Sequence, residues 1–340
     1  MTDALPVRIN GAFWPQPVTG QQRYAREVVS HLEPQGLEVL RPPGAWASSA
    51  PRSWAWTQLR LPALASGGVL VSLTSRAPVR HPRHVVTVHD LFVLTHPEWY
   101  SRRYAGVHRP LLRRLLRTAA AIVTVSDPVR DQIRELGLTP ERTPVEVAPN
   151  AAGAAFTGPA PALDLPFLAG RDVAGFFLAV GSLEPRKNLA RLIAAHQLLD
   201  DETRRAYPLV LAGASAAIFA GLALPQDDRV VLAGFVSDEV LASAYRQATA
   251  VIAPSLDEGF GLPVIEALHS GARVLASDIP VFHWVAGDAA EYFDPLDVAD
   301  LARVLGHALT HPPASPARAP RDYDYAVSAQ VIVDLARSVG

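Results

Sequence analysis

Short apolar runs alternate with helix-like segments along almost the whole chain. The runs are only a few residues long and rich in valine, leucine and alanine, which is typical of strands buried in a parallel sheet. The strand candidates are Val7–Phe13, Leu37–Leu40, Val69–Leu73, Val85–Val88, Ala121–Val125, Val145–Val147, Phe176–Val180, Leu209–Ala212, Val230–Ala233, Ala250–Ala253 and Arg273–Ala276. Helix candidates between them include Tyr24–Leu32, Pro128–Glu135, Leu189–Leu199 and Ser237–Ala248. The alternation predicts an α/β protein built from βαβ units.

The alternation is interrupted once near the middle of the chain and once near its end. The stretch Ala151–Arg171 is rich in Ala, Pro and Gly and weak in periodicity, as expected of an interdomain linker. The stretch His311–Pro320 precedes a helical segment, Tyr325–Ser338, for which Asp324 is a suitable N-cap. We therefore predict two Rossmann-like, doubly wound domains facing a cleft. Their expected bounds are 1–155 and 173–320, with a linker at 156–172 and a C-terminal helix at 321–340 that returns to the first domain.

Composition narrows the class of protein. Hydrophobic residues make up 49% and charged residues 19% of the 340 residues, which is typical of a folded globular chain. The formal net charge of −2 gives no global attraction to nucleic acid or to an anionic membrane. There is no cysteine, so disulfides and thiolate metal sites are excluded. Without a secretory signal or an apolar run of about 20 residues, we expect a cytoplasmic protein.

Arginine has displaced lysine almost everywhere in this chain. Of the 31 basic residues, Lys187 is the one lysine. Where arginine serves in nearly every basic position, a surviving lysine indicates a place where a compact ammonium group matters.

The segment Pro254–Gly271 follows a predicted buried strand and opens a helix. Gly259 and Gly261 allow a tight turn and a close approach of the backbone to a ligand, and the amides of the helix start can bind a phosphate. Glu258 and Glu266 stand at opposite ends of this loop and turn. Their carboxylates can accept hydrogen bonds from the hydroxyls of a ribose and of a hexose.

The segment Phe177–Leu189 is a second candidate for binding chemistry. A strand ends at Gly181, a turn follows, and Asn188 can cap the next helix. This is the carboxyl end of a parallel strand, where open α/β sheets bind their ligands. Arg186 and Lys187 lie in the turn, where they can neutralise a diphosphate and stabilise the charge that develops on it as a sugar departs.

These two segments resemble glycosyltransferase family 4, a family of retaining enzymes with the GT-B fold, and in particular its mannosyltransferase-like group. The resemblance covers nearly the whole chain, and Leu232–Val236, Val285–Ala290 and Phe293–Pro295 continue it in the family's order. It implies that Glu258 contacts the donor sugar, that Arg186 and Lys187 contact the diphosphate and that Glu266 binds the ribose. The resemblance also assigns four further residues to nucleotide binding, namely Ser182, Phe260, Gly261 and Leu262.

The first half of the chain resembles the family less specifically. Val18–Tyr24 is similar to a loop that faces the donor phosphates, although Gly20 stands alone where many members have two glycines. Thr87–Leu91 resembles the family's His-Asp motif and implies that His89 is a catalytic residue near the sugar. Trp284 replaces a glutamate that many members carry, so any contact made by that glutamate is lost.

The resemblance implies a specific reaction. A hexose, with mannose-like sugars favoured, would move with retention from a GDP- or UDP-linked donor to a glycan, lipid-linked or natural-product acceptor. The donor is a substrate, and neither a cofactor nor a metal ion is expected. The run Asp322–Asp324 follows no predicted strand, so we interpret it as the beginning of a helix and not as a metal-binding motif.

Three other classes of function compete with this interpretation. A non-catalytic nucleotide-sugar-binding partner of the same fold would be favoured if the carboxylates or cations were missing, and none is. A nicotinamide oxidoreductase would carry G-x-G-x-x-G after the first strand, which this chain does not. A GT-B phosphorylase needs a lysine for pyridoxal phosphate, and Lys187 within an Arg-Lys phosphate motif does not suit that role.

The segment Ser101–Ala121 has an unusual charge pattern. At about 100° per residue, its arginines gather on one side of a helix and Tyr104, Val107, Leu111 and Leu115 on the other. Pro110 interrupts the helical pattern. Two interpretations stay open: a solvated basic face, or a surface for anionic lipid or a phosphorylated acceptor, including peripheral contact with the inner membrane face. The arginines concerned are Arg102, Arg103, Arg109, Arg113, Arg114 and Arg117.

Overall fold

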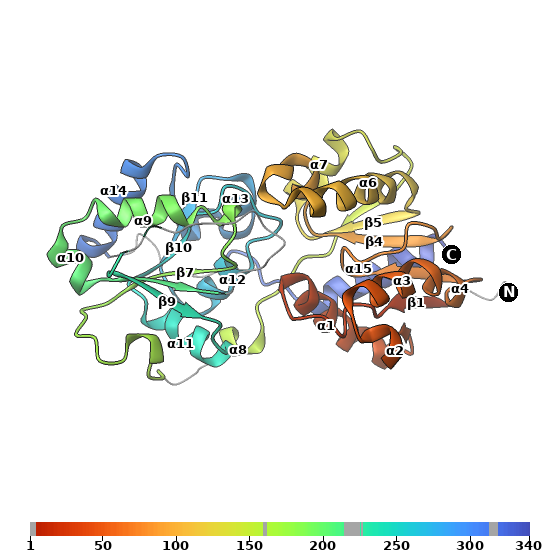
Figure 1. Cartoon of the computed structure of the whole chain (residues 1–340), viewed down its shortest axis with the longest axis horizontal. Helices are drawn as coiled ribbons and strands as arrows, with labels where there is room; N and C mark the ends of the chain where they lie inside the picture. Colours follow the sequence, from red (N-terminus) through yellow and green to blue (C-terminus); the bar gives the residue numbers. More distant parts are fainter. Residues whose placement is uncertain (1–4, 159–161, 214–224, 226, 313–318) are drawn as a thin grey trace. The chain divides into compact units, whose positions relative to one another are not determined.

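The structure is a computed structural model that describes residues 5–158, 162–213, 225, 227–312 and 319–340. The chain divides into two compact units (Figure 1). The first consists of Met1–Pro97, Arg103–Asn150 and Tyr323–Gly340, and the second of Glu98–Arg102 and Ala151–Asp322. Each unit contains one six-stranded sheet, and all the strand pairs in both sheets are parallel within the described residues.

The first sheet has the strand order β2-β1-β3-β4-β5-β6. Its strands are β1 (Val7–Asn10), β2 (Glu38–Leu40), β3 (Val69–Ser72), β4 (His84–Val88), β5 (Ala121–Thr124) and β6 (Val145–Val147). The accompanying helices are α1 (Gly20–Leu32), α2 (Gly44–Ala47), α3 (Ala50–Leu59), α4 (Leu61–Leu64), α5 (Phe92–Thr95), α6 (Arg102–Thr118), α7 (Asp127–Glu135) and α15 (Tyr325–Ser338).

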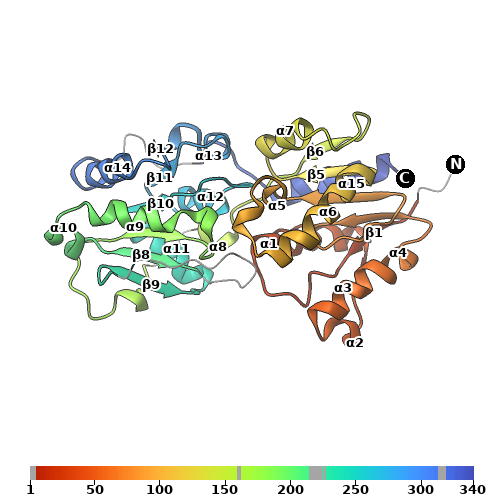
Figure 2. The same cartoon turned by 45° about the horizontal axis from the view of Figure 1, so that its top comes forward.

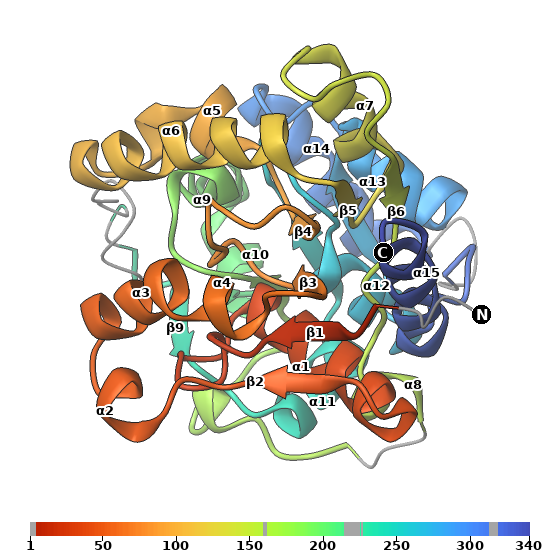
Figure 3. The same cartoon turned by 90° about the vertical axis from the view of Figure 1, so that its right-hand side faces the viewer.

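Helices cover both faces of this sheet (Figure 3). The register places Leu70, Val86 and Ile122 on one face, since residues paired across parallel strands point the same way. Leu70 packs against Trp56 of α3 and Leu61 of α4. Val86 and Ile122 pack against two leucines of α6 and against apolar side chains of α7. The opposite face is covered by α1 and α15, which lie against each other.

The C-terminal helix α15 belongs to the first unit, as the sequence predicted. Ser328 donates a hydrogen bond to the carbonyl of Pro149 (2.7 Å), and the ring of Tyr325 lies edge-on to Tyr24 of α1. Asp324 caps the helix by accepting a hydrogen bond from the amide of Ala326 (2.7 Å). The chain therefore crosses to the second unit and returns.

The second sheet has the strand order β12-β11-β10-β7-β8-β9. Its strands are β7 (Phe177–Val180), β8 (Leu209–Ala212), β9 (Val230–Gly234), β10 (Ala250–Ala253), β11 (Val274–Ser277) and β12 (Ala290–Phe293). The helices of this unit are α8 (Ala154–Thr157), α9 (Leu189–Gln197), α10 (Asp201–Ala206), α11 (Asp238–Gln247), α12 (Leu262–His269), α13 (Pro280–Ala286) and α14 (Val298–Thr310).

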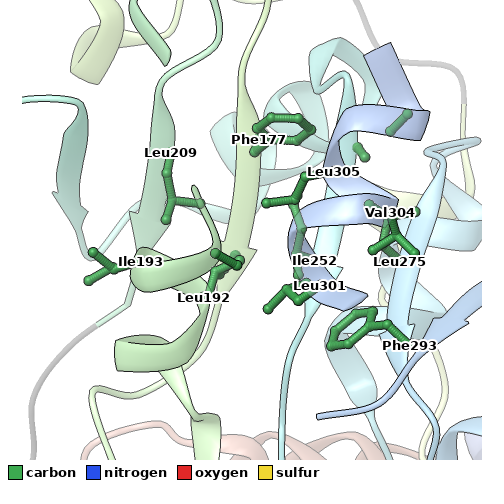
Figure 4. Close-up of a cluster of buried hydrophobic side chains, with 14 of the residues drawn as sticks. Phe177, Leu192, Ile193, Leu209, Ile252, Leu275, Phe293, Leu301, Val304 and Leu305 are labelled. Atoms are coloured by element: carbon green, nitrogen blue, oxygen red, sulfur yellow. The ribbon is translucent and has the colours of Figure 1, made fainter. Parts of the chain in front are cut away.

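The core of the second unit lies between this sheet and helices α9 and α14 (Figure 4). Phe177, Ile252 and Leu275 project from neighbouring strands onto Leu192 of α9 and Leu305 of α14, and all five are fully or almost fully buried. Helices α8, α11 and α12 pack on one another, with α12 also against β10 and β11, to form the other helical layer (Figure 2). This sandwich fixes the carboxyl ends of β7 and β10.

The secondary structure differs from the sequence-based prediction in two places. Strand β12 was not predicted, because Glu291 and Tyr292 interrupt its apolar character. The segment Val18–Tyr24 is not a loop, because α1 already begins at Gly20. Thr19 precedes the helix, where its amide donates to the side chain of Gln22 and its carbonyl accepts from the amide of Arg23. The helix therefore begins four residues earlier than the hydrophobic periodicity indicates.

Candidate functional site

The carboxyl ends of β7 and β10 bring the two sequence segments together. The two strands are neighbours in a parallel sheet, so the loops that follow them leave from the same edge. The amide of Leu256, after β10, donates to the carbonyl of Arg186, after β7, at 2.9 Å. This bond fixes one loop against the other.

Glu258 is the centre of a buried ionic cluster at this edge. Lys187 Nζ lies 2.6 Å from Oε1 of Glu258, and Arg186 Nη1 lies 2.5 Å from its Oε2. Ser255 Oγ donates a further hydrogen bond to Oε1 at 2.8 Å. The family resemblance implied that Glu258 contacts the sugar and the two cations the diphosphate, and the structure shows all three side chains in direct contact.

Arg186 is held by a second carboxylate. Its Nη2 lies 2.6 Å from Oε1 of Glu184, and its Nη1 donates to the carbonyl of Asp257 at 3.0 Å. Glu184 was not singled out from the sequence, and neither was Ser255. With Glu184 included, the cluster contains two cations and two carboxylates, so its formal charge is zero and the burial of each ion is compensated.

The environment of Glu258 fixes its protonation state. Burial by itself would raise the pKa of this carboxyl, since its side chain is only 9% exposed. Arg186, Lys187 and the hydrogen bonds from Lys187 and Ser255 outweigh burial and lower the pKa to about 2. Glu258 is therefore ionised at neutral pH, where it can accept hydrogen bonds but cannot donate a proton.

Two glycines make room for Lys187. Gly181, at the end of β7, has φ +148°, and a Cβ there would lie 2.7 Å from Cε of Lys187. Gly213, at the end of β8, has φ +144°, and a Cβ there would lie 1.9 Å from the carbonyl oxygen of Gly181. A side chain at either position would push into the backbone or the ammonium stem. The position of Lys187 therefore depends on glycine at both strand ends.

The turn that carries the two cations is anchored on its far side by Asn188. This residue does precede α9, but its side chain does not cap the helix, contrary to the expectation. Its backbone has φ +55°, a left-handed conformation that turns the side chain away from the helix amides. Asn188 instead donates to the carbonyl of Pro295 at 2.8 Å and accepts from Arg191 at 2.8 Å.

The start of α12 has the backbone expected of an anion site. Gly261 precedes the helix with φ +90°, and a Cβ at this position would lie 3.0 Å from the ring of Phe282. Phe260 is buried and its ring lies edge-on to Trp284. The first N–H groups of a helix have no intrahelical acceptor and suit a phosphate. Leu262 begins this helix, and Ser182 lies partly exposed just after β7.

Glu266 stands apart from the ionic cluster. It lies in the middle of α12 at 4% exposure, and its Oε2 accepts a hydrogen bond from the hydroxyl of Tyr245 on α11 at 3.3 Å. Tyr245 was not found from the sequence, because nothing in its local pattern separates it from a core residue. The two glutamates thus occupy different surroundings, one among cations and one beside a neutral hydroxyl.

His89 and Gly20 belong to the first unit. His89 follows β4 and is buried, and its Nε2 donates to the carbonyl of Leu73 at 2.9 Å, which leaves Nδ1 as an acceptor. Burial lowers the pKa of His89 to about 4, although the bond to Leu73 opposes this in part. The imidazole is therefore neutral at pH 7. Gly20 is the exposed first residue of α1.

Within the described residues, no group of three or more His, Cys, Asp or Glu side chains is arranged to hold a metal ion. None of the helices in the described parts of the chain is long and apolar enough to cross a bilayer.

Two protein-family models match this chain, and one of them spans the site described above. The family model "Glycosyl transferases group 1" matches residues 171–323, and the model "Glycosyltransferase Family 4" matches residues 62–152, so that together they cover more than half of the chain. The chain belongs to glycosyltransferase family 4. The matched region 171–323 contains the whole ionic cluster and helix α12.

Individual relatives point to the same family. The chain is 35% identical over 231 residues to O-antigen chain mannosyltransferase B of Escherichia coli, covering 65% of this chain and 60% of that protein. It is 28% identical over 247 residues to O-antigen chain mannosyltransferase RfbU of Salmonella typhimurium, covering 71% and 65%. The matches thus span less than two thirds of the length of these relatives.

Solved structures show the same fold. The glycosyltransferase WaaG, described as involved in lipopolysaccharide biosynthesis, aligns with a TM-score of 0.67 at 16% identity, covering 96% of this chain and 95% of WaaG. Anabaena Alr3699/HepE in complex with UDP-glucose aligns with a TM-score of 0.69 at 16% identity, covering 98% and 100%. The fold is GT-B, as the sequence predicted.

Proposed function

We propose that this protein is a retaining, metal-independent glycosyltransferase that moves a mannose-like hexose from a GDP- or UDP-linked donor to a glycan acceptor. The observation that carries the proposal is the buried contact of Arg186 and Lys187 with Glu258 beside the start of α12. The names of the relatives, two of them O-antigen chain mannosyltransferases, support mannose and a polysaccharide acceptor.

The cluster suits a leaving diphosphate. Arg186 and Lys187 are already oriented and largely removed from water, so they stabilise developing negative charge without reorganising. The diphosphate would share these cations with Glu258, whose ionised carboxylate is then free to accept a hydrogen bond from a sugar hydroxyl. Since Glu258 remains ionised, it does not serve as a general acid in this proposal.

The rest of the donor would lie along α12. The N–H groups around Gly261 and Leu262 suit the distal phosphate, and Glu266 suits the ribose hydroxyls, with Tyr245 fixing the orientation of its carboxylate. In the first unit, the neutral His89 offers Nδ1 as an acceptor for a sugar hydroxyl. Retention and independence from metal are proposed on the strength of family membership and of this cationic cluster.

A donor screen tests the proposal. Thermal shifts with GDP, UDP, ADP and dTDP would identify the nucleotide, because a ligand that binds only the folded state stabilises it. The matching nucleotide-mannose and nucleotide-glucose are then incubated with the enzyme, with and without a glycan acceptor. Sugar transfer or slow donor hydrolysis is the expected result. Binding of a nucleotide sugar without any turnover would favour the alternative, a non-catalytic partner of the same fold.

A chelator tests the metal-independent part of the proposal. We expect turnover to be unchanged within about twofold in excess EDTA, because Arg186 and Lys187 supply the positive charge that a metal would otherwise provide. Activity that is lost in EDTA and restored by Mg²⁺ or Mn²⁺ would contradict it.

A further inference from the structure

Helix α6 carries six arginines and no acidic residue. Since the whole chain has a formal net charge of −2, the remainder of the chain has a formal charge of −8. No guanidinium of this helix has an acidic partner within ion-pair distance in the described parts of the chain. The positive charge of α6 is thus local and not neutralised by its surroundings.

The helix presents these arginines outward. Its buried side consists of Ala105, Leu115 and Leu116, and the two leucines pack on the sheet. The helix continues through Pro110, which did not break it, and over 17 residues it is about 25 Å long. Arg109 is half-buried, and the remaining five arginines are exposed: Arg102, Arg103, Arg113, Arg114 and Arg117.

The outward side of α6 also has an apolar component. Val107 was expected on the buried side with the leucines, but it is 49% exposed and lies at the edge of the arginine side. At about 100° per residue, position 107 falls closer to Arg103 and Arg114 than to the buried Leu116. Gly106 and Pro110 lie exposed between the arginines, so the surface between the guanidinium groups carries neither charge nor a large side chain.

We propose that this arginine face of α6 docks on a membrane surface of anionic phospholipids. Guanidinium groups complement lipid phosphates, their aliphatic stems can lie along the interface, and each basic residue near an anionic bilayer strengthens binding by about fivefold. The inference rests on the charge and exposure of α6 and is independent of the reaction proposed above.

Other anionic partners fit this face less well. The open depression of about 480 Å³ beside the helix is lined by residues of α6 alone, so no second element closes over a small phosphate ligand. Single-stranded nucleic acid is bound largely through aromatic stacking, and the exposed side of α6 offers no aromatic ring.

Vesicle sedimentation of the full chain tests this proposal. We expect binding to vesicles of phosphatidylcholine mixed with phosphatidylglycerol, but not to phosphatidylcholine alone, and weaker binding as salt is raised. The triple variant R113Q/R114Q/R117Q should bind at least about tenfold more weakly. The matched control is R83Q/R142Q/R337Q, which removes the same charge from three exposed arginines of the first unit outside α6, and it should bind within about twofold of the unmodified chain.

Three results would overturn the proposal: no binding to the anionic vesicles, an equal loss in both triple variants, or displacement by inorganic phosphate that exceeds displacement by chloride at the same ionic strength. The last result would indicate a discrete phosphate site in place of a membrane surface. The circular dichroism spectrum and the melting temperature of each triple variant should match those of the unmodified chain, which verifies that each is folded.

Discussion

In the second unit, several charged side chains are buried, whereas in the first unit every fully buried polar side chain among the described residues is formally neutral. The buried charges of the second unit are Glu184, Lys187, Glu258, Glu266 and Arg273. In the first unit, His89 donates to a backbone carbonyl, and Asn10 at the end of β1 donates to Ser72 Oγ at 3.0 Å and to the carbonyl of Arg76 at 2.7 Å.

The difference has a physical reason. Burying an ion is costly unless it is paired, so a protein retains buried charges chiefly where they are needed or where structure compensates them. Arg273 is the structural case, since it pairs with Glu291 at 2.7 Å and donates to the carbonyl of Ala308 at the end of α14. The remaining four lie after β7 and β10 or on α12. The buried charges of the second unit are thus concentrated at the candidate site, and those of the proposed donor site lie in this unit alone among the described residues.

Replacing Lys187, one of the buried charges of the second unit, should have the largest effect on activity. Lys187→Ala should lower kcat by about 100-fold or more, because it removes a preorganised cation whose contribution is largest as charge develops on the leaving group. Lys187→Arg should also lose activity, since a planar fork does not fit the space of the ammonium over Gly181. Steady-state kinetics measures kcat for each variant, and circular dichroism verifies that each variant is folded.

The control for this variant is Arg205→Ala, an exposed position on α10 whose partner is Asp201. It should leave turnover unchanged. If Lys187→Ala keeps more than about a third of the activity, the ammonium does not stabilise the leaving group.

Removing the other buried carboxylate tests whether the two glutamates differ in role. Glu266→Ala should weaken nucleotide binding by about thirtyfold, the cost of losing one hydrogen-bonded charged acceptor. Tyr245→Phe should cost only a few-fold, because it removes a hydrogen bond at 3.3 Å and leaves the carboxylate in place. Titration calorimetry with the identified nucleotide measures both. Affinity that stays within about twofold in Glu266→Ala would rule out the ribose assignment.

Gly181 allows the position of Lys187 to be changed without touching its charge. In Gly181→Ala, the new Cβ would lie 2.7 Å from Cε of Lys187, so the lysine side chain must shift, and we expect about a tenfold loss of kcat. The matched control is Gly137→Ala, where φ is +60° but nothing lies within 4 Å of the added Cβ. The control should lose about 1 kcal/mol of stability from backbone strain and keep its turnover. Equal turnover in the two variants would contradict the steric argument.

The smallest effect concerns pH. Glu258 stays ionised above a pKa of about 2 and His89 stays neutral above a pKa of about 4, so neither group changes its charge between pH 6 and 8, and kcat should vary by less than about threefold there. A bell-shaped profile within that range that disappears in His89→Gln would show that His89 titrates during turnover.

Stability should respond to acid before activity does. The pKa of His89 is lowered in the folded state, so an unfolded chain takes up a proton below about pH 6.5 while the folded chain does not, and stability falls as the pH is lowered from 6.5 to 4. Glu258 adds to this loss from about pH 4.5 down to 2, because its folded pKa is also lowered. The melting temperatures of the unmodified chain and of His89→Gln should therefore differ less at pH 5 than at pH 7.

Much of the fold was accessible from the sequence because it depends on local patterns. Val145–Val147, Leu209–Ala212 and Ala250–Ala253 form strands with the predicted bounds, since a short apolar run between turn residues has few other solutions. The candidate site was accessible in part for a related reason. Lys187 is recognisable because it is the one lysine of the chain, and a glycine-rich turn before a helix is recognisable from the sequence as well.

What only the tertiary structure decided concerns residues distant in sequence. Lys187 and Glu258 are 71 positions apart, and their contact follows from the strand order, which sets β10 beside β7 and cannot be read from either segment. The roles of Gly181 and Tyr245 are equally invisible locally, because each depends on what faces it. Val107 and Asn188 departed from expectation for the same reason, because a helical periodicity or a cap preference describes only the average behaviour of a residue. The way α6 packs on the sheet left Val107 exposed, and a left-handed backbone turn directed the side chain of Asn188 away from the helix amides.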